Sequence, residues 1–138
     1  MPVYNFVVAP NLEPEARRSL AQCITDAHCG VTGAPPEFVH VFFHDGRKPQ
    51  RGDAIDLRVA ASVRAGRPDS VNRAIEQHFA NGAQNALPGR TIEARFSFRE
   101  TPAKWVMEGG AVLPEPGDEA RWMQEHWNRA HHEVDPGR

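Results

Sequence analysis

The sequence predicts an α+β fold in which two pseudo-symmetric βαβ units form a four-stranded sheet with two helices on one face. Segments rich in β-branched and aromatic residues, typical of strands, alternate with segments whose apolar residues recur at helical spacing. The order strand, helix, strand occurs twice. The two halves align without a gap at a constant offset of 55 residues, which places Leu20 on Ile75 and Val41 on Phe96. Two units are too few for a solenoid, so we expect a single domain over residues 1–138.

The first unit covers residues 1–45 and begins with a predicted strand, "VYNFVVA" at 3–9. The segment "PEARRSLAQCITDAH" at 14–28 is a predicted helix, and Pro14 suits its first turn. The segment "EFVHVFFHD" at 37–45 is the second predicted strand, with one apolar face and one face that carries histidines. These faces consist of Val39, Val41 and Phe43 on one side and of His40, Phe42 and His44 on the other.

The second unit covers residues 54–100 and repeats this order. We expect strands at "IDLRVAASV" (55–63) and "TIEARFSFRE" (91–100), with a helix at "DSVNRAIEQHFANGAQ" (69–84) that Asp69 or Ser70 can cap. A βαβ crossover favours parallel pairing of its two strands, so two units side by side leave one sheet face without helices. An oligomer is the natural cover for such a face.

Residues 101–138 form a C-terminal segment outside the repeat. It contains a short turn or helix, a glycine-rich reversal, an extended stretch, and a final helix that carries Trp122. Its "VMEGGAV" stretch lacks the lysine and the strand-to-helix setting of a phosphate-binding loop. We therefore expect no nucleotide and no other cofactor.

Composition excludes several classes of function. A net charge of −2 and a pI near 6.4 give no reason to expect a nucleic-acid partner or an anionic membrane. Without an apolar stretch of membrane-spanning length or a leader-like start, the default expectation is a cytoplasmic protein. Cys23 and Cys29 have neither redox nor zinc spacing and are expected to be free thiols. His40 and His44 share a strand face but lack a third ligand, so we expect no metal site.

The first candidate for chemistry is Pro2. Initiator methionine is usually removed when the next residue is small, and removal of Met1 would leave a secondary amine at the start of a strand. An α-amino group has a pKa of about 7.7–8.0, and burial lowers it further. Such a nitrogen can exchange protons near neutral pH. A proline after methionine is also common without any function, so the other residues must decide.

Arg64 and Arg67 are the second candidate. They lie three residues apart in the predicted loop before the second helix, where two guanidinium groups can hold a carboxylate bidentately. The alternative is an ordinary pair of loop arginines bound to Asp69 or to glutamates.

Taken together, these residues resemble the tautomerase superfamily, whose members use an N-terminal proline and are built from βαβ units. Within it, the chain is similar to the cis-3-chloroacrylic acid dehalogenase group, which carries two fused units per chain. The similar stretches are "MPVY" at the start, "ITDAH" at 24–28, "RAGR" at 64–67, "E-x-P-A" at 100–103, and "E-x-G-x-x-L-P-x-P-G" at 108–117, followed by Trp122. They keep their order over nearly the whole chain.

The resemblance implies a role for each matching residue. Pro2 would exchange a proton with a substrate carbon, and Arg64 and Arg67 would bind the substrate carboxylate. His28 would bind the same carboxylate or a neighbouring carbonyl oxygen, and Glu108 would activate or position water. The resemblance also implies a homotrimer and a small-molecule carboxylate substrate. Without it, His28 would be interpreted as a helix-end histidine and Glu108 as a solvated acid.

One position departs from the family. The dehalogenases place a tyrosine three residues before the glutamate of "E-x-P-A", and here that position is Ser97, a possible substitute with a shorter and less acidic hydroxyl. The tyrosine expected after Glu108 is replaced by Gly109. We therefore rank keto–enol tautomerisation of a 2-oxo acid ahead of hydration or of dehalogenation of a 3-haloacrylate.

Two other functions remain open at this stage. A catalytically degenerate family member would act as an oligomeric small-ligand-binding module, and it is favoured if Met1 is retained, because an acylated proline nitrogen is neither acid nor base. The duplicated βαβ pattern alone would also suit a ferredoxin-like domain that binds a small ligand or haem.

Overall fold

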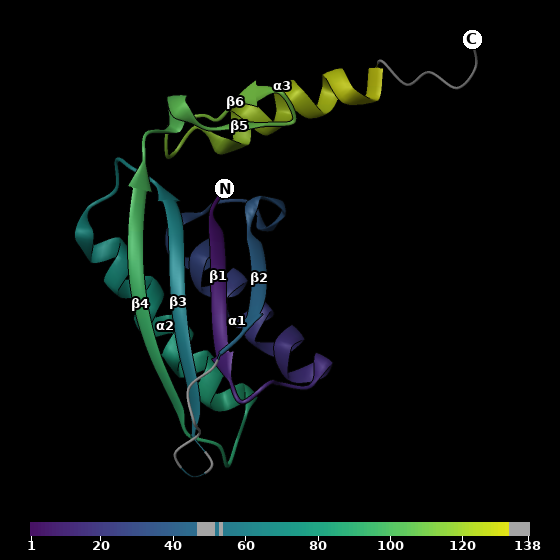
Figure 1. Ribbon diagram of the computed structural model, residues 1–138. Helices are drawn as coiled ribbons and strands as arrows, with labels where there is room; N and C mark the ends of the chain where they lie inside the picture. Colours follow the sequence, from purple (N-terminus) through teal and green to yellow (C-terminus); the bar gives the residue numbers. More distant parts are fainter. Residues whose placement is uncertain (47–51, 53, 133–138) are drawn as a thin grey trace.

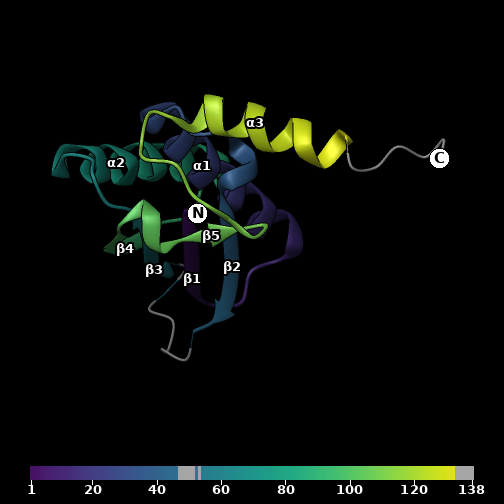
Figure 2. The same cartoon turned by 90° about the horizontal axis from the view of Figure 1, so that it is seen from above.

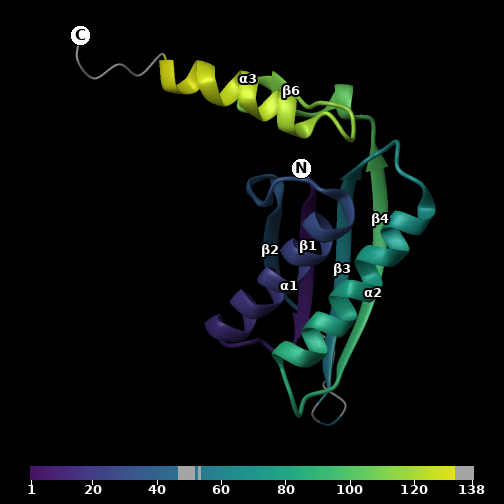
Figure 3. The same cartoon turned by 180° about the vertical axis from the view of Figure 1, so that it is seen from behind.

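The computed structural model describes residues 1–46, 52 and 54–132 and confirms the predicted fold class. One mixed sheet has the strand order β2-β1-β3-β4, and helices α1 (Pro14–Thr32) and α2 (Asp69–Ala86) both cover the same face (Figures 1 and 3). The strands are β1 (Val3–Ala9), β2 (His40–Asp45), β3 (Ile55–Arg64) and β4 (Ile92–Thr101).

The strand register shows the internal symmetry directly. β1 pairs with β2 in parallel, β3 pairs with β4 in parallel, and the two units meet at an antiparallel β1–β3 pair. In that central pair Asn5 lies opposite Ala60, and these two residues are also equivalent at the offset of 55 found in the sequence (60 − 5). The pseudo-two-fold axis therefore passes through this pair and relates one end of the sheet to the other.

The core lies between the sheet and the two helices. Alternate residues of β1 point into it, and Tyr4, Phe6 and Val8 are all buried. Phe6 packs edge-on against Phe79 of α2, with ring centroids 5.7 Å apart. Apolar positions at helical spacing supply the helix side of this core, namely Leu20, Ile24, Ile75 and Phe79.

Several boundaries differ from the predictions. The residues Pro36–Phe38 form a 3-10 turn, η1, so β2 begins at His40 rather than at residue 37. Helix α1 continues four residues past the predicted end at His28 and stops at Gly33, whose φ of 74° favours glycine. The N-cap of α2 is Pro68 without a side-chain hydrogen bond, so the expected cap by Asp69 or Ser70 is wrong.

No element packs on the second sheet face within the described part of the chain. Its side chains are the polar or exposed partners of the alternation predicted from sequence, including Phe42, which is 53 % exposed. Arg58 and Ala60 of β3 are exposed on the same face. This chain alone leaves the face open, as expected from the sequence (Figure 1).

The C-terminal segment crosses one end of the sheet. After the 3-10 turn η2 (Ala103–Trp105), β5 (Met107–Glu108) and β6 (Ala111–Val112) form a small hairpin, and α3 (Glu119–His132) follows. The segment lies over the end at which β1 begins and β3 and β4 finish (Figures 1 and 2). Trp122 fixes α3 there, because it packs edge-on against Phe38 and donates a 2.8 Å hydrogen bond to the carbonyl of Val112. Residues 133–138 of the predicted segment lie outside the described residues.

Among the described residues, none of the helices combines the length and the apolar character that a membrane crossing requires.

Candidate active site

Chain topology brings most of the predicted site residues to the end of the sheet over which the C-terminal segment lies. We call this end the covered end. Because β1 and β3 are antiparallel, the start of β1 lies beside the end of β3, with Val3 opposite Ser62. Helix α1 crosses from the end of β1 to the start of the parallel strand β2, so its final turns return to the same end. Pro2, His28 and Arg64 therefore come close together, although they are far apart in the sequence.

The N-terminal amine lies against Glu108. In this structure Met1 carries that amine, and its nitrogen contacts the carboxylate of Glu108 in β5. Pro2 follows as a buried residue whose carbonyl accepts a 3.0 Å hydrogen bond from the amide of His40. Burial, with the positive charge of Arg64 as a second cause, lowers the pKa of the Met1 amine to about 5. With this pKa the Met1 amine is mostly neutral at pH 7, and a neutral amine can accept a proton.

His28 is buried, and one of its two ring nitrogens has a partner. Its Nδ1 lies 2.8 Å from the hydroxyl of Tyr4, whereas its Nε2 is buried with no hydrogen-bond partner among the described residues. Burial lowers the pKa of His28 to about 3, and the positive charges of Arg67 and Arg64 add to this effect, so the ring is neutral. Burial also raises the pKa of Tyr4, which keeps its hydroxyl protonated.

The contact with Tyr4 fits both tautomers of the neutral ring. If the Tyr4 hydroxyl donates to Nδ1, the imidazole proton lies on Nε2, which is then a buried N–H with no acceptor among the described residues. Sequence reasoning did not single out Tyr4. Its position two residues after Pro2, on the same face of a strand, was the available signal.

Arg64 and Arg67 lie together, and both bind Glu119 at the start of α3. The Nη2 atoms of Arg64 and Arg67 donate to Oε1 of Glu119 at 2.6 and 3.2 Å. Arg64 also donates from Nη1 to the carbonyl of Pro114 at 2.6 Å. Arg64 is the last residue of β3 and is 2 % exposed, so the expectation that it lies in the following loop is wrong.

The open alternative for the arginines is correct in part. They do pair with an acidic side chain, but Asp69 is not that partner; Arg64 is buried and Arg67 half-buried, so neither is a solvated loop arginine. Sequence reasoning missed Glu119. It lies just beyond the "L-P-x-P-G" stretch, where neither a periodic pattern nor a ligand spacing marks it.

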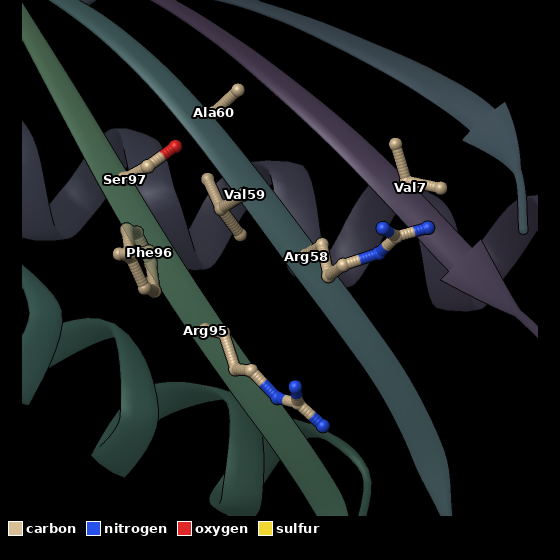
Figure 4. Close-up of a pocket in the computed structure, with 7 residues that line it drawn as sticks. All are labelled: Val7, Arg58, Val59, Ala60, Arg95, Phe96 and Ser97. Carbon is tan, nitrogen blue, oxygen red and sulfur yellow. The ribbon is translucent and has the colours of Figure 1, made fainter.

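Ser97 does not reach this end of the sheet in its own chain. It pairs with Ala60 in β4 and lies four residues before Thr101, the partner of Arg64, which is roughly 13 Å along a strand. Figure 4 shows it with Arg58 and Arg95 around a pocket on the open sheet face. The possible substitute for the family tyrosine is therefore separated from the other candidates by both distance and face.

Within the described residues, no group of three or more His, Cys, Asp or Glu side chains is arranged to hold a metal ion. Cys23 and Cys29 are both free and half-buried. The groups available for chemistry are thus an amine, two carboxylates, two guanidinium groups and a neutral imidazole, an arrangement suited to binding a small anion and moving a proton on it.

Comparison with solved structures gives similar folds. The structure described as N1, a member of the cis-3-chloroacrylic acid dehalogenase family, has a TM-score of 0.68 at 20 % identity and covers 96 % of this chain and 99 % of its own. The Q0 fused 4-OT symmetric trimer has a TM-score of 0.66 at 17 % identity (83 % and 97 % covered). Pt0534, inactivated by 2-oxo-3-pentynoate, has a TM-score of 0.63 at 17 % identity (80 % and 94 % covered).

No curated protein sequence matches this chain significantly. A family model does match it, over residues 1–129, which is most of the chain and includes the site residues named above. The resemblance found in the sequence is confirmed by this match, and the chain belongs to the Tautomerase_3 family, described as putative oxalocrotonate tautomerase enzymes.

Proposed function

We propose that this chain is a cofactor-free enzyme that uses the N-terminal amine of Pro2 to move a proton on a small carboxylate substrate. The reaction best supported is keto–enol tautomerisation of a 2-oxo acid such as phenylpyruvate. One observation carries the proposal: the N-terminal amine, Glu108, His28 and both arginines meet at one end of the sheet, where the amine has a lowered pKa.

Each group has a defined part in this reaction. Arg64 and Arg67 bind the substrate carboxylate, and the Nε2–H of His28 donates a hydrogen bond to the oxygen on C2. In the direction from keto to enol, the neutral amine accepts a proton from C3, and the electron pair of that C–H bond forms the C2–C3 double bond. The C2 oxygen becomes an enolate and then takes one proton from solvent, while the ammonium returns the proton it accepted to solvent, so the amine ends neutral and atoms and charge balance. The reverse direction runs through the same steps.

Removal of Met1 is part of the proposal. While Met1 is attached, the nitrogen of Pro2 is an amide and cannot act as a base. Its removal would free that nitrogen one residue further into the same buried end of the sheet, beside Arg64 and Glu108. The lowered pKa of the Met1 amine supports a base at this place, because burial and Arg64 would act on a prolyl amine in the same direction.

The proposal also includes self-association of the chain. The open sheet face of this chain and the trimers formed by fused 4-OT proteins support a homotrimer in which neighbouring copies cover that face. Ser97 lies on the face that would be covered, so it would take part in chemistry only at the site of a neighbouring copy.

Hydration of an unsaturated acid, with dehalogenation of a 3-haloacrylate as its variant, is the second candidate reaction. The contact between Glu108 and the amine favours it, since a carboxylate there can orient water beside the substrate. Ser97 and Gly109 argue against it because no phenol is supplied at either position. A panel of enol, 3-haloacrylic and acetylenic acids separates the two reactions.

The test has two steps. The mass of the intact purified protein shows whether Met1 is absent; retention of Met1 would contradict the proposal and favour a binding module. In the processed protein, Pro2→Ala should slow ketonisation of the enol of phenylpyruvate at least about tenfold, since a positioned acid–base group contributes on the order of 10²–10⁴ in rate. The matched control is Pro88→Ala, which alters an exposed proline after α2. Unchanged rates in Pro2→Ala would overturn the proposal.

A further inference from the structure

Glu119 occupies an unusual position in the candidate site. Among the described residues it is the only acidic residue that is buried, with 5 % of its surface exposed. Its Oε1 atom accepts hydrogen bonds from both Arg64 and Arg67, the two residues proposed to bind the substrate carboxylate. The protein thus places a carboxylate of its own beside the groups that are expected to bind one.

The position of this carboxylate is fixed by the C-terminal segment itself. Oε2 of Glu119 accepts a 2.8 Å hydrogen bond from the amide of Gly117, two residues earlier. Arg64 is tied to the same segment through the carbonyl of Pro114. Burial acts to raise the pKa of Glu119, but hydrogen bonds from backbone amides and from Arg64 outweigh it and lower the pKa overall. The side chain is therefore ionised at neutral pH and held from two sides.

The arginines keep unused hydrogen-bonding capacity. A guanidinium group has five N–H donors. Arg64 uses its Nη1 for Pro114 and its Nη2 for Glu119, and Arg67 uses only its Nη2 in the hydrogen bonds described. The described residues make no further hydrogen bond to these two guanidinium groups, and 12 % of the Arg67 side chain is exposed. Glu119 therefore does not fill the arginine pair.

Charge is what Glu119 does change. Two guanidinium groups carry two positive charges, and one buried carboxylate cancels one of them. The pair is left with one positive charge to be matched by a ligand, in a setting of low dielectric where an unmatched charge is costly. One substrate carboxylate matches it, whereas a second carboxylate would be left without a partner.

We propose that Glu119 is a specificity-determining residue: it sets the net charge of the Arg64–Arg67 pair so that the site accepts one carboxylate and discriminates against a second. This inference rests on the proposed function, since it assumes that the arginine pair binds the substrate. Glu119 also holds the guanidinium groups in place, but orientation alone would favour monoanionic and dianionic ligands equally.

The test compares two ligands that share a carbon skeleton, cis-but-2-enoate with one carboxylate and maleate with two. Their dissociation constants are measured by calorimetry on the intact protein, at a pH where maleate is fully ionised. The unsubstituted protein should bind cis-but-2-enoate more tightly than maleate. Glu119→Gln removes the charge and keeps an acceptor oxygen, and it should shift the ratio of the two constants toward maleate by about tenfold or more, as expected for one charge at close range.

Two further variants control for fold and for overall charge. Glu119→Asp keeps the charge and should keep the preference of the unsubstituted protein. Glu115→Gln makes the same charge change at an exposed residue of the same segment, and it should leave the ratio unchanged. If Glu119→Gln does not fold, the preference of the unsubstituted protein and of Glu119→Asp still decides, because equal binding of the two ligands in both overturns the inference.

The other outcomes are equally decisive. Tighter binding of both ligands by the same factor in Glu119→Gln would mean that Glu119 competes with substrate, and weaker binding of both by the same factor would mean that it only positions the arginines. Either result overturns the specificity role but leaves the proposed function intact. Failure of the unsubstituted protein to bind either acid would overturn the inference, whereas the proposed function is decided separately by turnover of the 2-oxo acid.

Discussion

The two ends of this sheet are related by the internal repeat, yet only one of them carries the residues of the candidate site. At the covered end lie Pro2, Tyr4 and His28 of the first unit. Their equivalents at the offset of 55 are Leu57, Val59 and Ala83, which are 0, 2 and 1 % exposed and contribute to the core. The equivalents of Arg64 and Arg67, in the opposite direction, are Ala9 and Leu12, each 5 % exposed.

This difference shows that the fold provides two similar positions and that a few polar residues make one of them a site. The two helices begin at equivalent residues, Pro14 and Asp69, and the strands of the two units overlap at the same offset, because apolar periodicity positions them in both. The described polar or charged residues that are buried are His28, Arg64 and Glu119, and all three lie at the end that the C-terminal segment crosses, where Pro114 and Glu119 supply partners for Arg64. Buried polar groups need such partners. The opposite end, where the equivalent positions are apolar, is called the apolar end below.

The largest effect on stability and binding is expected when a charged residue of the covered end is replaced by an apolar one, as at the equivalent position of the other end. Arg64→Met should lower the free energy of unfolding by about 3 kcal/mol or more, because Glu119 would remain as a buried charge that has lost its closest partner. It should also abolish carboxylate binding. Urea unfolding and calorimetry measure the two effects. Arg58→Met, on the exposed open face, is the matched control and should change neither by much.

The converse substitution places a site residue at the apolar end. Ala83→His should destabilise the protein by about 2 kcal/mol, because the ring overpacks a filled site and its nitrogens lack partners there. At this end Val59 stands where Tyr4 stands at the other, so no hydroxyl can bind the imidazole. Ala86→His at an exposed helix position serves as the control in thermal and urea unfolding. A stable Ala83→His protein would show that the two ends differ less than their burial indicates.

A pH series tests the environment of His28 itself. Its pKa is about 3 in the folded protein and near 6.5 in the unfolded chain, so only the unfolded chain binds a proton between these values. The stabilising contribution of the neutral ring is therefore complete above pH 6.5 and is lost as the pH falls toward 3. From pH 6.5 to about 4.5 the loss should be on the order of 2 kcal/mol. His28→Gln should flatten this part of the curve, whereas His78→Gln, at an exposed position on α2, should not. An unchanged slope in His28→Gln would contradict the burial of a neutral ring.

The sequence was sufficient for the fold because local patterns determine it. The apolar stripes of both helices and the alternation along the strands identify the buried faces, and the repeat indicates how the two units are arranged. The errors lie at boundaries, such as residues 37–39, where prolines and a 3-10 turn replace the start of a strand. Turn geometry of this kind depends on contacts that no periodicity reports.

The candidate site residues were named from two sources: the residue types themselves for Pro2 and the arginine pair, and the family resemblance for His28 and Glu108. Chain topology then explains why Pro2 and His28 lie at one end of the sheet, because a strand start and a helix end have definite positions in a βαβ unit. Glu119 could not be predicted, because its contact with Arg64 spans 55 residues and depends on the path of a segment without regular pattern. Ser97 aligned with a family position, but an alignment does not tell whether a residue contributes to the site of its own chain or to that of a neighbouring copy.

A smaller effect is expected from the hydroxyl that separates Tyr4 from an ordinary core residue. Tyr4→Phe removes the partner of His28 Nδ1 and should cost about 1 kcal/mol of stability. If the hydroxyl also fixes the proton on Nε2, kcat for phenylpyruvate ketonisation should fall about tenfold while KM changes little. Steady-state kinetics and urea unfolding measure these effects separately. Equal kcat in the variant would mean that the tautomer of His28 does not matter for the reaction.

The smallest effect is expected for substitution of Ser97, which lies midway along β4 rather than at either end of the sheet. It is exposed on the open face and lies about four residues from the strand end that carries Arg64, so its hydroxyl has no contact to lose within its own chain. Ser97→Ala should change the free energy of unfolding by less than about 0.5 kcal/mol. A matching absence of effect on turnover would confine the chemistry to the covered end of a single chain. A loss of turnover at unchanged stability would instead require that the open face of one copy completes the site of another, because no path within one chain connects this hydroxyl to the arginine pair.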